Sequence, residues 1–86
     1  MATPTAQRRG TAAFTVAASA DPQLLCRMLG FIARLGRVPD GAEAVRRGDD
    51  MRVSIRLDDI ETGHAELLAE NIRAMIHVAA VRLVVC

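Results

Sequence analysis

The sequence predicts an α+β fold whose strands and helices follow the order βαββαβ. Two stretches, residues 11–18 and 51–58, alternate apolar and polar side chains with the period of a half-buried strand. Two others, residues 22–35 and 65–76, repeat apolar side chains at helical spacing. Residues 78–85 alternate again at the end of the chain. Two helices with one apolar stripe each need a shared apolar surface, which a four-stranded antiparallel sheet with one covered face supplies.

The stretch from residue 11 to residue 36 predicts a strand, a very short loop and a helix. Asp21 suits the N-cap and Pro22 suits the first helical position, so we predict a helix over residues 22–35. Gly36 stands where a left-handed residue ends a helix. The predicted apolar stripe of this helix is Leu25, Leu29 and Ile32, with Met28 and Leu35 beside it. Free backbone amides at such a helix start attract anions, so this loop is the first candidate for a ligand site.

The rest of the chain predicts a hairpin, a second helix and a closing strand. We predict a weak strand at residues 42–47 after Pro39, a turn at residues 48–50 and a clear strand from residue 51. Its apolar face is predicted to contain Met51, Val53, Ile55 and Leu57. A polar connection, residues 58–62, should lead to the second helix, capped by Glu61 or Thr62. The predicted stripe of that helix is Ala65, Leu68, Ala69, Ile72, Met75 and Ile76.

With right-handed crossovers this order gives a ferredoxin-like sandwich, in which two helices cover one face of the sheet. The first and third strands should be central, and the second and fourth should lie at the edges. We expect the covered face to contain Phe14, Val16, Val53, Ile55 and Leu83, packed against Leu25, Leu29, Ile32, Leu68 and Ile72. The edge strand at residues 42–47 is unprotected, so we predict a homodimer through that edge or through the helix faces.

Length and composition narrow the class of protein. The 86 residues suffice for one domain, and the first ten are polar and aperiodic. We therefore expect a disordered leader at residues 1–10 and a single domain at residues 11–86. A net charge of +1 gives no ground for a nucleic-acid or membrane partner, and no apolar run reaches the length of a membrane span. Cys26 and Cys86 lie far apart, so we expect no disulfide framework and a reducing, cytoplasmic compartment.

The chemistry-bearing residues are isolated from one another in the sequence. RNA-recognition domains share this element order but stack bases on strand aromatics, and the strand from residue 51 has none. Copper chaperones need a thiolate pair in the first loop, whereas Cys26 stands alone inside a predicted helix. His64 and His77 have no catalytic partner at a telling spacing. We therefore expect no catalytic residues, no metal and no cofactor, and predict that the chain is not an enzyme.

Short motifs along most of the chain resemble those of an ACT domain. They are Phe14–Val16, Ala20–Leu29, Leu35–Gly36 and the strand entry Ile76–Val81. The pattern of a strand, Asp-Pro, Leu, Arg, aliphatic pairs and Gly looks most like the short regulatory small subunits of acetolactate synthase. The resemblance implies a regulatory module that senses an amino acid or docks on a larger subunit, is usually dimeric and is not itself catalytic.

The resemblance also implies where a ligand would bind. The implied pocket lies between Asp21, Gln23 and Leu24 of one protomer and Arg37, Val38 and Pro39 of its neighbour. The loop would offer helix-start amides to a carboxylate, and Leu24 or Val38 would line an aliphatic pocket. Amino-acid-responsive members usually carry Gly after the Pro and often Asn two residues before it. Here Gln23 and Ala20 occupy those positions, so we expect a weak or absent response to valine.

Two functions follow from these observations. The first is a regulatory subunit that docks on the larger catalytic subunit of an amino-acid biosynthetic enzyme, acetolactate synthase of branched-chain synthesis being the one expected. The alternative is a free-standing ACT-domain dimer that senses a small amino acid.

Overall fold

A computed structural model describes residues 9–86, and its six elements follow the predicted order βαββαβ. They are β1 (Arg9–Ser19), α1 (Leu24–Arg34), β2 (Gly41–Arg47), β3 (Asp50–Glu61), α2 (Thr62–Arg73) and β4 (Val78–Val85). The leader expected over residues 1–10 lies outside the described residues except for Arg9 and Gly10. These two residues begin β1, so the first strand starts two residues before the expected Thr11.

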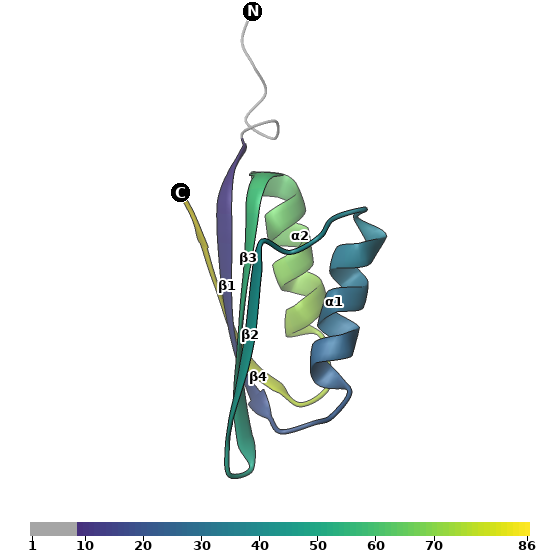
Figure 1. Cartoon of the computed structure of the whole chain (residues 1–86), viewed down its shortest axis with the longest axis vertical. Helices are drawn as coiled ribbons and strands as arrows, with labels where there is room; N and C mark the ends of the chain where they lie inside the picture. Colours follow the sequence, from purple (N-terminus) through teal and green to yellow (C-terminus); the bar gives the residue numbers. More distant parts are fainter. Residues whose placement is uncertain (1–8) are drawn as a thin grey trace, which may run out of the picture.

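The four strands form one antiparallel sheet in the order β2-β3-β1-β4, which confirms the predicted ferredoxin-like topology. The first and third strands are central and the other two are edges, as expected. Phe14 on β1 lies opposite Ile55 on β3 and Leu83 on β4. Both helices cover the same face of the sheet (Figure 1). A two-residue turn, residues 48–49, joins β2 to β3, so Asp50 belongs to the strand and not to the turn.

The core lies between the helices and the covered face of the two central strands. The predicted sheet residues Phe14, Val16, Val53 and Ile55 are at most 2% exposed. Leu68 and Ile72 of α2 are equally buried, so this half of the predicted packing is confirmed. Leu83 is only partly buried because β4 is an edge strand.

The apolar stripe of α1 differs from the predicted one. Ile32 is buried, as predicted, but its buried companions are Leu24 and Met28, whereas Leu25 and Leu29 lie partly buried at the margin of the core. Apolar residues occupy both sets of positions, so helical spacing alone does not say which set faces inward. The way α1 lies against the sheet selects the set that begins at Leu24.

The connection from β3 to α2 also differs from the prediction. The structure has no polar loop at residues 58–62, because β3 continues to Glu61 and α2 begins at Thr62. Asp59 adopts a left-handed conformation with φ of 51°, which brings Ile60 onto the core face at 1% exposure. The helix ends at Arg73, so Ile76 lies beyond it and is 68% exposed instead of packing in the stripe.

Within residues 9–86, neither helix is long and apolar enough to cross a lipid bilayer.

Candidate functional site

The six residues predicted to bind a ligand fall into two groups at opposite ends of α1. Asp21, Gln23 and Leu24 lie where the chain enters the helix, and Arg37, Val38 and Pro39 lie where it leaves (Figure 1). One protomer therefore does not bring the two groups together. A shared pocket requires the helix start of one copy beside the helix end of another.

The entry to α1 is a turn closed by Asp21. Oδ1 of Asp21 accepts a hydrogen bond from the amide of Gln23 at 2.9 Å, and the carbonyl of Asp21 accepts from the amide of Leu24 at 3.2 Å. The Asp21 carboxylate thus closes a turn just before the helix. The prediction of Asp21 as the N-cap is wrong, because the regular helix begins at Leu24, two residues after the expected Pro22, and its N-cap is Gln23, which makes no side-chain cap bond. Asp21 is half-buried and Gln23 is exposed, while Leu24 is 1% exposed and belongs to the core.

Two backbone amides at this helix start have no acceptor. Among the described residues, nothing accepts from the amides of Leu25 and Cys26, whereas those of Gln23, Leu24 and Arg27 are bonded. Unbonded amides at a helix N-terminus carry partial positive charge and favour an anion beside them. The entry turn therefore keeps two donors for a carboxylate.

The exit from α1 is a Schellman motif closed by Gly36, whose φ is 71°, as predicted. The amide of Gly36 donates to the carbonyl of Ala33 at 2.9 Å, and the amide of Arg37 donates to that of Ile32 at 3.2 Å. The left-handed residue reverses the chain at once. Arg37 is thereby turned from the helix end toward β3.

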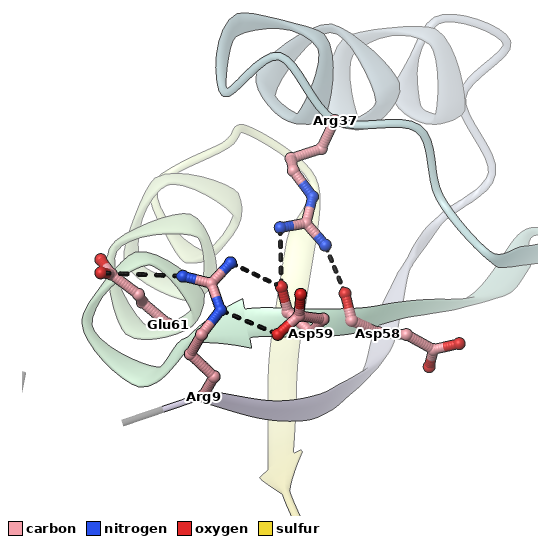
Figure 2. A network of polar contacts seen from close by, with 5 residues as sticks. All are labelled: Arg9, Arg37, Asp58, Asp59 and Glu61. Carbon is pink, nitrogen blue, oxygen red and sulfur yellow. Dashed lines mark hydrogen bonds and ion pairs between the residues drawn. The ribbon is translucent and has the colours of Figure 1, made fainter. Parts of the chain in front are cut away.

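Arg37 binds the backbone of a β-bulge in β3. Gly10 pairs with Ile60 but Ala12 pairs with Leu57, so β3 holds one extra residue there. The guanidinium of Arg37 donates to the carbonyls of Asp58 and Asp59, the latter at 2.9 Å (Figure 2). These contacts occupy two of the Arg37 donors.

Arg9 binds the same bulge from β1. Its guanidinium donates to the Asp59 carboxylate at 2.8 Å and to the Asp59 carbonyl at 2.9 Å, and it lies 3.8 Å from the Glu61 carboxylate (Figure 2). The hydrogen bond to the Asp59 carboxylate, with the attraction of that charge, raises the pKa of Arg9. The sequence predicts Arg9 in a disordered leader, and this is wrong because Arg9 begins β1; a bulge formed by pairing of distant strands leaves no local signal for this contact.

The segment between α1 and β2 is also held at its far end. The amide of Asp40 donates to the carbonyl of Arg56 at 2.9 Å, and the Asp40 carboxylate accepts from the amide of Asp58 at 2.7 Å. Val38 stands between these anchors and is 81% exposed, while Pro39 is half-buried. The arrangement presents an apolar side chain to the surface on a segment fixed at both ends.

Other polar groups and hollows lie away from these residues. Among residues 9–86, no three His, Cys, Asp or Glu side chains are placed to hold a metal ion, and Cys26 and Cys86 are exposed free thiols. A hollow of about 310 Å³ lies beside α1, and one of about 710 Å³ lies over the outer face of the sheet. Neither hollow is lined by any of the six predicted residues.

Comparison with known proteins identifies the type of domain. The sequence profile of the ACT-like domain family matches residues 5–86. No curated protein is significantly similar in sequence.

Solved structures with the same fold are distant in sequence. The ACT domain from GTP pyrophosphokinase of Chlorobium tepidum superposes with a TM-score of 0.76 at 10% identity, over 90% of this chain and 100% of that one. A homoserine dehydrogenase from Thiobacillus denitrificans gives 0.81 at 14% identity, over 96% of this chain but 19% of the dehydrogenase chain. An uncharacterized protein from Thermotoga maritima gives 0.73 at 8% identity, over 91% of this chain and 98% of that one.

Proposed function

Because the chain belongs to the ACT-like domain family, we propose that it is a non-catalytic regulatory subunit that docks on and modulates an amino-acid biosynthetic enzyme. The observation that carries the proposal is that the family profile spans residues 5–86 of an 86-residue sequence. The enzyme we propose is acetolactate synthase, on the likeness of the Asp21–Leu29 and Leu35–Gly36 segments to its small subunits.

The proposed effector is an aliphatic amino acid held between two protomers. Pairing of two β2 edges about a two-fold axis perpendicular to the sheet would extend the sheet and set the two α1 helices antiparallel. The entry turn of one copy would then face the exit segment of the other. This places the free amides of Leu25 and Cys26 across from the exposed Val38 of the neighbour.

Each of the six proposed residues has a different role in this pocket. Asp21 fixes the turn and leaves the amides for the carboxylate of the effector. Val38 and Pro39 of the neighbour line the aliphatic side. Arg37 is committed to the β3 bulge, so it positions Val38. Leu24 is buried, so it anchors the turn to the core. Gln23, exposed beside the amides, restricts close approach of a carboxylate.

An assay of an acetolactate synthase catalytic subunit, with and without this chain, tests the docking. We expect higher activity or stability of the enzyme when the chain is present, and little or no response to valine.

Calorimetry with valine, leucine and isoleucine measures amino-acid binding by the proposed pocket directly. Val38→Ser should weaken any binding, whereas Leu67→Ser, at a 55% exposed position of α2, should leave it unchanged.

The alternative, a free-standing dimer that senses an amino acid, is favoured by one observation. The superposition on the Thermotoga maritima protein covers 98% of that chain, so a fold of this size also makes up nearly the whole of another chain. Tight amino-acid binding with no effect on any synthase would support this alternative. Catalytic activity of the isolated chain would contradict both functions.

A further inference from the structure

The outer face of the sheet, opposite the helices, has side chains in three cross-strand rows. The strand registers place Glu43, Ser54, Thr15 and Arg82 in one row from β2 to β4. The row on one side is Val45, Arg52, Ala17 and Ala80, and the row on the other is Gly41, Arg56, Ala13 and Val84. We refer to these twelve residues as the outer face.

The outer face has a ridge on β3 and a trough on β1. Arg52 and Arg56 are exposed on β3, and directly beside them β1 exposes only Ala17 and Ala13. A hollow of about 710 Å³ covers the part of the face that includes Ala17 and Arg52. Between these two alanines β1 carries Thr15, so its outward side chains are small along all three rows. The shape of the face therefore suits a second layer that brings a ridge to the trough.

Charges on the outer face are placed at opposite edges and are unpaired. Glu43 lies on the β2 edge and Arg82 on the β4 edge of the same row, and both are exposed. Over residues 9–86, neither Glu43 nor Arg82 makes a side-chain hydrogen bond or an ion pair. Arg56, by contrast, pairs with Asp58 at 3.2 Å. One row thus ends in a free anion on one side and a free cation on the other.

We infer that the outer face binds the outer face of a second copy of this chain, about a two-fold axis that runs parallel to the strands between β1 and β3. This operation lays β2 over the partner's β4 and β3 over the partner's β1. Glu43 then faces the partner's Arg82, and Arg82 faces the partner's Glu43. Each ridge arginine faces an alanine, because Arg52 meets the partner's Ala17 and Arg56 meets the partner's Ala13.

The alternative axis is disfavoured by the same registers. A two-fold axis across the strands through the middle row would set Glu43 against Glu43, Arg82 against Arg82 and Arg52 against Arg56. Like charges placed opposite each other destabilise an interface. The acidic Glu43 among the arginines, and the lack of an aromatic side chain on the outer face, also favour a second copy over a nucleic acid.

The size of the outer face sets the expected affinity. Four strands about 4.8 Å apart and three rows about 7 Å apart cover roughly 400 Å² of flat area. That is about half of the 800 Å² per partner of a standard interface, so we expect a dimer that forms at high concentration. This interface is distinct from the β2 edge pairing proposed above and does not rest on it.

Analytical sedimentation from about 10 µM to about 1 mM measures self-association, and variants that reverse the charges of Glu43 and Arg82 test the inference. Glu43→Arg and Arg82→Glu should each raise the dissociation constant at least about tenfold, because each sets like charges opposite each other. The double variant should restore dimerisation. Two strands separate Glu43 from Arg82 within one protomer, so restoration must come from contacts between copies.

Matched controls separate this interface from others. Glu66→Arg and Arg27→Glu make the same charge changes at exposed positions of the two helices and should leave the dimer intact. A chain that stays monomeric at about 1 mM overturns the inference. So does an association that Arg82→Glu leaves unchanged, or one that the helix controls disrupt. Where the β2 edges also pair, the outer face joins two such dimers, and Arg82→Glu should then return a tetramer to a dimer. Far-ultraviolet circular dichroism confirms that every variant is folded.

Discussion

Arg9 and Arg37, which lie on opposite sides of α1 in the sequence, donate to one acceptor, the backbone carbonyl of Asp59, each at 2.9 Å (Figure 2). One guanidinium comes from the first residue of β1 and the other from the segment after α1. Asp59 occupies the bulge of β3, where its left-handed conformation leaves its carbonyl out of the regular ladder. The two arginines thus tie the start of the sheet and the exit of α1 to the same irregular point.

Arg37→Met should destabilise the domain by about 1.5–3 kcal/mol, because two carbonyls of the bulge lose a charged donor. Urea unfolding measures the change. Arg27→Met is the matched control, since Arg27 is exposed on α1 and should tolerate the change within about 0.5 kcal/mol. Equal effects of the two variants would contradict a structural role for Arg37.

Arg9→Gln should lower stability by the same amount at about pH 6 and about pH 9. The pKa of Arg9 is raised by its hydrogen bond to the Asp59 carboxylate, so its contribution is complete below the unfolded-state pKa. That contribution is lost only as pH rises through the higher folded-state pKa, far above neutral. Unfolding curves of both proteins at the two pH values check this. A stability loss that differs between the two pH values would show that the titration of another group controls the effect of Arg9→Gln.

Ile55→Ala should cost about 2–5 kcal/mol, because it opens a cavity on the covered face of the central strand β3. Thermal and urea unfolding report the loss, which is large for a domain of this size. Leu67→Ala removes a similar side chain at a 55% exposed position of α2 and should change stability far less.

Gly10→Ala should displace the end of β4, because an added Cβ would lie 2.4 Å from the carbonyl oxygen of Cys86. Overpacking of this kind costs about 1–3 kcal/mol. Hydrogen exchange should show faster exchange of the Cys86 amide, which bonds to Thr11 at 3.0 Å. Gly41→Ala is the control, since the nearest atom to its added Cβ, on Arg56, is 3.9 Å away. A protected Cys86 amide in Gly10→Ala would refute the clash.

Gln23→Gly should strengthen binding of an aliphatic amino acid in calorimetry, because it removes the side chain beside the free amides of α1. The backbone of Gln23 is already right-handed, with φ of −94°, so the gain would come from access and not from a new conformation. Gln23→Ala keeps the Cβ and should gain less. No binding by any of the three proteins would count against the proposed pocket.

Local pattern in the sequence was enough to predict the element order, the topology and most of the sheet core. The period of residues 51–57 predicts which side chains of β3 are buried, because alternation depends only on the pleat. Gly36 predicts the end of α1, because a left-handed residue without a Cβ is what a Schellman motif needs. Asp21 indicates a short-range contact where the chain enters α1, and its carboxylate does accept from the amide of Gln23, although the helix N-cap is Gln23 and not Asp21.

Features that depend on how elements meet were decided by the tertiary structure. Leu24 and Leu25 are both apolar, so the sequence does not decide which of them faces the core. Packing of α1 on the sheet buries Leu24. The bulge at Asp59 arises from pairing with β1, so neither the burial of Ile60 nor the convergence of Arg9 and Arg37 is visible locally. The sequence by itself determined which helices and strands form, because the signal for each element lies within a few neighbouring residues. The tertiary structure decided how these elements are joined, because the residues that pair with one another are distant along the chain.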